Sequence, residues 1–286
     1  MSTHRLRPDR LVSLLLMRSG LAAKPRPASS VPILMYHSIS DEPEPGVSPY
    51  YRLHTPRQRF VEQLRLLREW GFTGVPLHAA ASMPPAGKAD GQPVVITFDD
   101  GFRDFVEHAA PVLSAEGFGA TIYLVTGPTE RAEAFNGKAL LSWHDARQLV
   151  QAGFQIGSHT VSHPVLTALP REQVAREISD SKDRIEQRIG QAVVSFSYPY
   201  RFPEQRTGFV AMLRGLLRDA GYREGVTTRI GVSGPDDDPL FRRRLPVNGA
   251  DDAALLRAKV SGAYDWLYAV QKAVKMMRPA HSRKDS

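Results

Sequence analysis

The sequence contains no cysteine, and this absence excludes disulfide bonds, thiolate metal sites and a cysteine nucleophile. The 22 glycines and 22 prolines follow no period, so a collagen-like chain is excluded as well. Hydrophobic residues make up 42% of the chain, which is too many for a disordered protein. The 286 residues therefore suit one large domain of the barrel type, or at most two smaller ones.

The positive charge is concentrated at the two ends of the chain. The net charge is +7, but residues 1–30 contain six basic and one acidic side chain, and residues 272–286 contain five basic and one acidic. The intervening residues 31–271 are left with a charge of about −2. A folded face with a basic stripe and interleaved aromatic side chains is not indicated, so we predict no nucleic-acid partner.

The start of the chain resembles a secretory signal, because Arg5, Arg7 and Arg10 precede the apolar residues 11–17. That apolar run is as short as such a region can be, and Arg18 interrupts it before any small-residue cleavage site. It is also far too short to span a bilayer. We therefore expect a cytoplasmic protein, or one peripheral to the inner membrane, rather than a secreted or periplasmic one.

Two interpretations of the basic ends stay open. The favoured one is a pair of solvated tails with a helix docked on the domain. The alternative is a basic amphipathic segment that lies against anionic lipid or a biosynthetic partner enzyme. Apolar and basic residues near the other end of the chain repeat that pattern, namely Trp266, Leu267, Val270, Lys272, Val274, Lys275 and Met276.

Strand patterns alternate with helix patterns through residues 31–271, which follow a proline-containing linker at 24–30. Strands are predicted at 33–36, 94–98, 121–125, 154–157, 193–196, 225–227 and 245–247, with helices between them, the longest at 171–189. Such alternation implies parallel strands joined by right-handed crossovers. We predict an α/β fold, a distorted or incomplete (β/α) barrel of about seven parallel strands, flanked by segments 1–30 and 272–286.

In a barrel of this kind the chemistry gathers where strands end, and Asp99, Asp100 and Gly101 follow the predicted strand 94–98. Consecutive strand residues point to opposite faces, so both carboxylates can face one pocket only if the chain turns there. Gly101 permits that turn. One carboxylate would then be free to bind a metal and its neighbour to act as a base. Taken alone, the sequence Asp-Asp-Gly is more typical of a turn with a helix-capping aspartate.

A second strand end carries His159 and His163. Pro164 disfavours the α conformation at the residue before it, so the two histidines are predicted to share a loop and not a helix face. Two neutral imidazoles and one carboxylate form the three-ligand set of catalytic zinc, which leaves one position for water. The spacing of the two histidines is weak evidence by itself.

Two further strand ends add candidates. Residues 197–201 read Ser-Tyr-Pro-Tyr-Arg after the strand 193–196, and a rigid proline-containing turn can hold a backbone N–H toward a developing oxyanion. His37 follows the strand 33–36. Each has a simpler explanation, an ordinary turn for the first and a hydrogen-bonded structural histidine for the second.

The motifs at 97–101, 158–164 and 196–200, in that order on successive strands, resemble the polysaccharide deacetylase family, also called the NodB-homology family or carbohydrate esterase family 4. The resemblance covers roughly residues 31–271. It implies a distorted (β/α) barrel and a zinc-type ion that assists removal of N- or O-acetyl groups from sugars. An acetylated glycan is the partner that it implies.

Carried over residue by residue, the resemblance makes Asp99 the general base and Asp100, His159 and His163 the metal ligands. Tyr200 matches the residue whose backbone N–H helps to bind the oxyanion. These roles imply that Asp99 takes a proton as water attacks the acetyl carbonyl.

The chain departs from the family pattern in two places. The arginine usually found just before the Pro-Tyr of the third motif is replaced, with Ser197 nearest to its place, so the restraint on the base is undefined. The late histidine that supplies the general acid is also missing, since only His281 follows His163. The sequence is similar to a circularly permuted branch that includes poly-N-acetylglucosamine deacetylases, in which the acid comes from an early Met-Tyr-His strand that maps onto His37.

The sequence leaves several alternatives open. Trp143, at a predicted helix start beside the barrel rim, is a candidate to stack on a sugar, and a packing role is equally consistent with its position. The chain is predicted to be a hydrolase of bacterial-type surface polysaccharide metabolism, preferably acting on N-acetyl groups. A barrel that binds a glycan or a partner without turnover, or an amide hydrolase with a non-sugar substrate, are the alternatives. Zinc is preferred from the ligand types, although cobalt or nickel would suit the same set.

Overall fold

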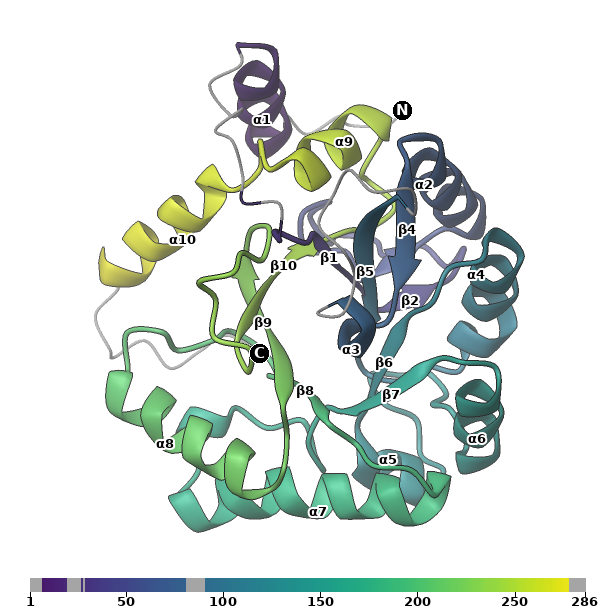
Figure 1. Ribbon diagram of the computed structural model, residues 1–286, viewed down its shortest axis with the longest axis vertical. Coiled ribbons are helices and arrows are strands. Elements are labelled where there is room, and N and C mark those ends of the chain that lie inside the picture. Colours follow the sequence, from purple (N-terminus) through teal and green to yellow (C-terminus); the bar gives the residue numbers. More distant parts are fainter. Residues whose placement is uncertain (1–6, 20–26, 28, 81–90, 278–286) are drawn as a thin grey trace.

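Parallel strands close into a ring at the centre of the molecule (Figure 1), a computed structural model that describes residues 7–19, 27, 29–80 and 91–277. Around the ring the order is β1 (Ile33–Tyr36), β10 (Arg242–Pro246), β9 (Glu224–Ile230), β8 (Ser195–Ser197), β7 (Gln155–Ser158), β6 (Thr121–Leu124) and β5 (Gln92–Phe98). β1 pairs with both β10 and β5, so the first strand closes the ring. The predicted barrel of about seven parallel strands is confirmed.

Three further strands lie outside the ring. β4 (Phe72–Val75) pairs in parallel with the first half of β5. β2 (Ser38–Ile39) and β3 (His54–Thr55) form a separate two-stranded parallel sheet just after the carboxyl end of β1. None of these strands was predicted, because each is short and β4 contains a glycine.

Helices surround the ring (Figure 1). They are α1 (Pro8–Arg18), α2 (Arg57–Glu69), α3 (Leu77–Ala80), a π-helical turn Phe105–Ala109 that continues into α4 (Ala110–Glu116), α5 (Thr126–Arg131), α6 (Trp143–Gln151), a 3-10 turn Leu166–Ala168, α7 (Arg171–Ile189), α8 (Thr207–Asp219), α9 (Ala253–Ser261) and α10 (Trp266–Met277).

Local sequence signals explain where several helices begin and end. The predicted helix 171–189 has the same bounds as α7, and Gly190 ends it in a left-handed conformation with φ 74°. A capping box opens α6, since Ser142 and Asp145 exchange side-chain and backbone hydrogen bonds. Gly262 (φ 82°) ends α9 in a left-handed conformation, and α10 begins at Trp266.

Alternation along the strands divides the core into two layers. In β5, Val94, Ile96 and Phe98 pack between the ring and its helices, whereas Val95 belongs to a smaller cluster that also takes side chains from β1, β6 and β9. That smaller cluster fills the interior of the ring, and Leu77 of α3 packs against it. Since side chains point alternately to the two faces, the strand residues with the parity of Val95 face the interior.

Candidate active site

Five side chains at the carboxyl ends of the strands point into the ring, as Val95 does. His37 follows β1, Asp99 follows β5, His159 follows β7, Ser197 ends β8, and Arg244 lies in β10 beside the outward-facing Leu245. Five strands of a closed ring therefore aim one polar side chain each at a common point.

Asp100, His159 and His163 come together as a group of metal-ligating side chains. The Oδ1 atom of Asp100 lies 3.7 Å from His159 Nε2 and 3.6 Å from His163 Nε2, and the two Nε2 atoms are 3.2 Å apart. Among the described residues, this is the only group of three or more histidine, aspartate or glutamate side chains whose ligand atoms all lie within 4.8 Å of one another. The spacing suits a single cation.

The turn that brings Asp100 into the site occurs at that residue itself. Asp100 has φ 71° and Gly101 has φ 72°, both in the left-handed region. Aspartate tolerates this conformation better than most residues, and glycine adopts it freely. Asp99 thus keeps its strand direction toward the ring interior, while Asp100 turns toward the two histidines.

Both imidazoles present the Nε2 atom to the metal site. Ser197 O lies 2.7 Å from His159 Nδ1, so Nδ1 carries the proton and donates, which leaves the Nε2 lone pair free. His163 adopts φ 55° in the loop after β7, and its backbone N–H donates to Thr160 Oγ1 over 3.0 Å. The predicted loop placement of the histidine pair is confirmed.

Glu177 of α7 holds that histidine loop from outside. Its carboxylate accepts hydrogen bonds from Val161 N (2.8 Å), Ser162 N (2.9 Å) and Ser162 Oγ (2.7 Å). The peptide between His159 and His163 is therefore fixed by a charged acceptor on a long helix. This brace preorganises the two metal ligands.

The protonation states in the site fit a divalent cation. Burial lowers the pKa of His159 and, together with the neighbouring imidazole, lowers that of His163 to about 3, so both rings are neutral, as ligands must be. Burial and the charge of Asp99 raise the pKa of Asp100 to about 8. A bound cation would offset the cost of ionising the buried Asp100 carboxyl group beside Asp99. The two imidazole nitrogens and the carboxylate oxygen are donors that suit zinc.

Asp99 is held in a buried ion pair with Arg244. The guanidinium donates from Nη1 to Oδ1 (2.8 Å) and from Nη2 to Oδ2 (2.7 Å), and Ser197 Oγ donates to Oδ1 over 3.1 Å. Burial alone would raise the pKa of Asp99, but the charge of Arg244 outweighs it and holds that pKa well below its usual range. Asp99 is therefore an ionised carboxylate next to the metal ligands.

Arg244 is the site residue that the sequence did not reveal. It lies in the run Arg242–Arg243–Arg244, which reads as a solvated basic stretch, and the predicted strand began one residue later at Leu245. In the structure its side chain is fully buried, and Nε also donates to Thr227 O over 3.1 Å. Because side chains alternate along a strand, Arg244 and Pro246 share one face of β10, and this is the face that points into the ring. That alternation was the signal that could have identified Arg244.

His37 and Tyr200 border the same point. Asp99 N donates to Tyr36 O over 3.0 Å, which joins the ends of β1 and β5 and places His37 beside the base. Burial lowers the pKa of His37 to about 4. The ring of Tyr200 packs 4.4 Å from that of His163 between centroids, and its carbonyl accepts from Thr228 Oγ1 over 2.9 Å, which fixes the local peptide.

Trp143 lies at the first position of α6, and its polar edge is occupied. Its Nε1 donates to Glu130 Oε2 over 2.8 Å, and the guanidinium of Arg188 lies 6.0 Å from its ring centroid. The ring also packs against the core. These contacts give it a structural role, and stacking on a sugar stays a prediction.

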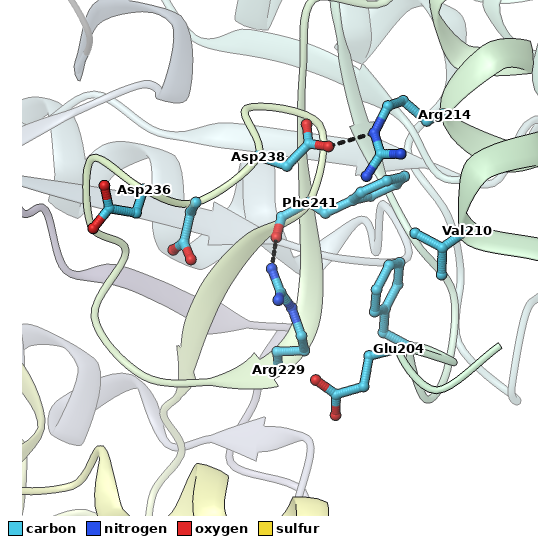
Figure 2. Close-up of a pocket in the computed structure, with 9 residues that line it drawn as sticks. Glu204, Val210, Arg214, Arg229, Asp236, Asp238 and Phe241 are labelled. Carbon is cyan, nitrogen blue, oxygen red and sulfur yellow. Dashed lines mark hydrogen bonds and ion pairs between the residues drawn. The ribbon is translucent and has the colours of Figure 1, made fainter. Parts of the chain in front are cut away.

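Two hollows are lined in part by residues of β9. One, of about 140 Å³, is lined by Met35, Tyr50, Thr228, Ile230, Arg244 and Pro246. The other, of about 180 Å³, is lined by Phe202 and Glu204 together with residues of α8, of β9 and of the segment before β10 (Figure 2). In this second hollow Arg214 pairs with Asp238 over 2.6 Å and ties α8 to that segment. Arg244, which pairs with Asp99, is among the residues that line the first hollow, so this hollow borders the site.

Comparisons with known proteins agree with this geometry. The family described as Polysaccharide deacetylase matches residues 86–224. The chain is 31% identical over 221 residues to a Bacillus subtilis (strain 168) protein named "Putative polysaccharide deacetylase YxkH", covering 77% of this chain and 72% of that protein.

Solved structures show the same fold. The Streptococcus pyogenes deacetylase PplD, determined in complex with acetate, is 26% identical with a TM-score of 0.66, covering 81% of this chain and 98% of that one. IcaB from Ammonifex degensii is 25% identical with a TM-score of 0.66, covering 81% and 97%. The resemblance seen in the sequence motifs is confirmed: this chain belongs to the polysaccharide deacetylase family, whose members are hydrolases that act on amide C–N bonds.

Proposed function

We propose that this protein is a metal-dependent deacetylase that removes N-acetyl groups from a glycan of surface polysaccharide metabolism. The observation that carries the proposal is the convergence of Asp100, His159 and His163 beside an ionised, unligated Asp99. Structural carboxylates are seldom buried next to one another without a cation between them. Two adjacent residues thus take different roles: Asp100 binds the metal and Asp99 acts as the base.

A zinc-type ion bound by Asp100, His159 and His163 would polarise the acetyl carbonyl and lower the pKa of water. The other steps are assigned to side chains and one backbone group of this protein. Asp99, oriented by Arg244 and Ser197, accepts a proton from the attacking water. The backbone N–H of Tyr200 donates to the developing oxyanion, an interaction worth about 3–4 kcal/mol per good donor.

His37 is assigned to the departing sugar nitrogen, which leaves poorly as an anion and needs a proton. The burial that lowers its pKa to about 4 makes the resting ring neutral at pH 7, so the proton must reach it during turnover. The charge of Asp99 acts in the opposite direction and favours the imidazolium. Activated acetyl esters, whose leaving groups need no proton, do not require this step.

The metal assignment is tested with His159→Ala and His163→Ala, using zinc titration by calorimetry and acetate release from N-acetylglucosamine oligomers. Both variants are expected to lose zinc binding and acetate release. His144→Ala, an exposed histidine at the start of α6, is the matched control. Unchanged zinc affinity in either ligand variant would refute the assignment.

The acid assignment is tested with His37→Ala on two substrates. We expect a rate loss on the order of 10² to 10³ on N-acetyl substrates and little loss on an activated acetyl ester. Equal losses on both substrates would show that His37 has only a structural role. A comparison of N-acetylated with O-acetylated oligomers tests the preferred linkage.

A further inference from the structure

Helix α1 is docked with two polar side chains inward and two of its four leucines outward. Asp9 and Ser13 are buried, whereas Leu11 is 58% exposed and Leu15 is 57% exposed. A surface helix of a soluble domain ordinarily presents the opposite arrangement, with its apolar stripe toward the core. The exposed pair is spaced i, i+4, so the two leucines lie side by side on one helix face.

Directional hydrogen bonds fix this orientation. Tyr264 OH donates to Asp9 Oδ2 over 2.9 Å, and Trp266 Nε1 donates to Ser13 Oγ over 2.9 Å. Tyr264 lies in the segment that joins α9 to α10, and Trp266 is the first residue of α10; α1 packs beside α9 (Figure 1). Turning α1 to bury its leucines would break both bonds and leave a buried tyrosine hydroxyl unpaired, which is unfavourable.

Ion pairs on the flanks of α1 reinforce the docking. Arg7 pairs with Asp9 over 2.6 Å and with Asp251 over 3.3 Å, and Arg10 pairs with Asp252 over 2.6 Å. The helix is therefore anchored by satisfied polar groups, and its exposed leucines contribute nothing to that anchoring. Leu11 and Leu15 are therefore exposed while α1 is docked on the barrel.

The outward face of α1 combines apolar and positive character. Arg18, which is exposed, follows Leu11 and Leu15 at helical spacing, and Leu14 flanks them. The single acidic residue among the first thirty is Asp9, which points inward and is paired. Of the six Lys and Arg residues in positions 1–30, two lie in α1 and four lie on either side of it.

Exposed leucines beside positive charge favour one kind of binding partner for this face of α1. A second copy of the chain would bring two positive faces together, which opposes self-association. An anionic bilayer attracts the charge and accepts the leucines at the boundary of headgroups and acyl chains. None of the described helices is long and apolar enough to cross a bilayer. The 11 residues of α1 span about 16 Å, a length suited to lying in the plane of the interface.

We propose that the outward face of α1, formed by Leu11, Leu14, Leu15 and Arg18, binds the surface of an anionic membrane. The helix inserts its leucines at the interface while Asp9 and Ser13 keep it attached to the barrel. The enzyme is then a peripheral membrane protein whose attachment surface lies outside the ring of strands. This inference is independent of the deacetylase chemistry.

The experiment measures co-sedimentation of the full chain with vesicles of phosphatidylcholine alone and of phosphatidylcholine with phosphatidylglycerol in equal amounts. We expect binding to the anionic vesicles that declines with added salt, and little binding to the neutral ones. The double variant Leu11→Gln/Leu15→Gln should bind the anionic vesicles about tenfold more weakly or worse. Arg18→Glu should weaken binding several-fold.

Matched controls use residues far from α1. Val165→Gln changes another exposed apolar side chain, and Arg176→Glu reverses an exposed charge on α7; neither should affect vesicle binding. Because Leu11 and Leu15 make no anchoring contact, the double variant should keep the wild-type unfolding temperature. Equal binding by wild type and double variant overturns the proposal, as does failure of the wild type to bind. A wild-type dimer that the double variant converts to a monomer would also overturn it, in favour of self-association.

Discussion

Arg244 on β10 holds Asp99 after β5 through two parallel hydrogen bonds, Nη1 to Oδ1 at 2.8 Å and Nη2 to Oδ2 at 2.7 Å. The family pattern has an arginine just before the Pro-Tyr of the third motif, and in this chain Ser197 is nearest to its place, which left the restraint on the base undefined. The guanidinium thus reaches the base from a different strand. The fork geometry fixes the carboxylate plane as well as its charge.

The first prediction concerns Arg244→Met. Removing the guanidinium leaves Asp99 buried without its cation, so its pKa rises and the ionised base is lost at low pH. We expect a loss of acetate release on the order of 10²-fold at pH 7 and an acid limb of the pH–rate profile displaced to higher pH. Arg243→Met, which removes a partly exposed arginine paired with Asp237, is the control and should leave the profile unchanged.

The same substitution should destabilise the fold. Breaking a buried ion pair by removing one partner costs about 3–5 kcal/mol, and both side chains here are almost fully buried. Urea unfolding of the metal-free protein measures it. A stability unchanged within about 0.5 kcal/mol would contradict the paired state of Asp99.

The second prediction compares Ser197→Ala with Ser195→Ala on the same inward face of β8. Ser197 Oγ donates to Asp99 and accepts from Arg244 Nη2 over 3.2 Å, so its loss should lower the rate by about tenfold. Ser195 Oγ instead bonds with Tyr123 OH. The Ser195 variant should retain the wild-type rate, and a common loss in both would indicate a general effect on the strand.

The third prediction concerns the helix that braces the histidine loop. In Glu177→Gln the side chain keeps one acceptor oxygen and loses its charge, so the loop that carries His159 and His163 is held less firmly. We expect zinc affinity to fall about 10- to 100-fold, as loss of such supporting contacts typically does. Glu172→Gln, on the exposed first turn of α7, should bind zinc like the wild type.

The fourth prediction concerns pH and the docking of α1. Burial alone would raise the pKa of Asp9, but Arg7 outweighs it and lowers that pKa below its ordinary value. A carboxyl group with a lowered pKa stabilises the docked state above its unfolded-state pKa of about 3.9, and this stabilisation is lost as the pH falls through the lowered value.

Hydrogen exchange of the α1 amides therefore should accelerate as the pH falls below about 4, after correction for intrinsic exchange rates. Asp9→Asn removes the titrating group, so its α1 amides should exchange faster already at pH 6 and gain less on acidification. An identical pH dependence in both proteins would show that another group controls the docking.

The sequence motifs placed Asp100, His159 and His163 after the ends of two strands, and the structure brings these three side chains together, while their roles in catalysis stay predictions. The barrel itself follows from the alternation of strands and helices, and α7 was predicted to the residue. Two features could not be predicted. The positive φ of Asp100 depends on the site around it, since aspartate has no strong local preference for that conformation. The pairing of Arg244 with Asp99 joins residues 145 apart in sequence, and only the closed ring brings them together.

The closure of the ring by β1 has a consequence for biosynthesis. Residues 86–224, the part that matches the family, contain Asp99, Asp100, His159, His163 and Tyr200, but neither His37 nor Arg244. The ribosome adds β10 after every one of these five residues, so the two hydrogen bonds from Arg244 to Asp99 can form only when nearly the whole barrel has been synthesised and β10 lies between β9 and β1.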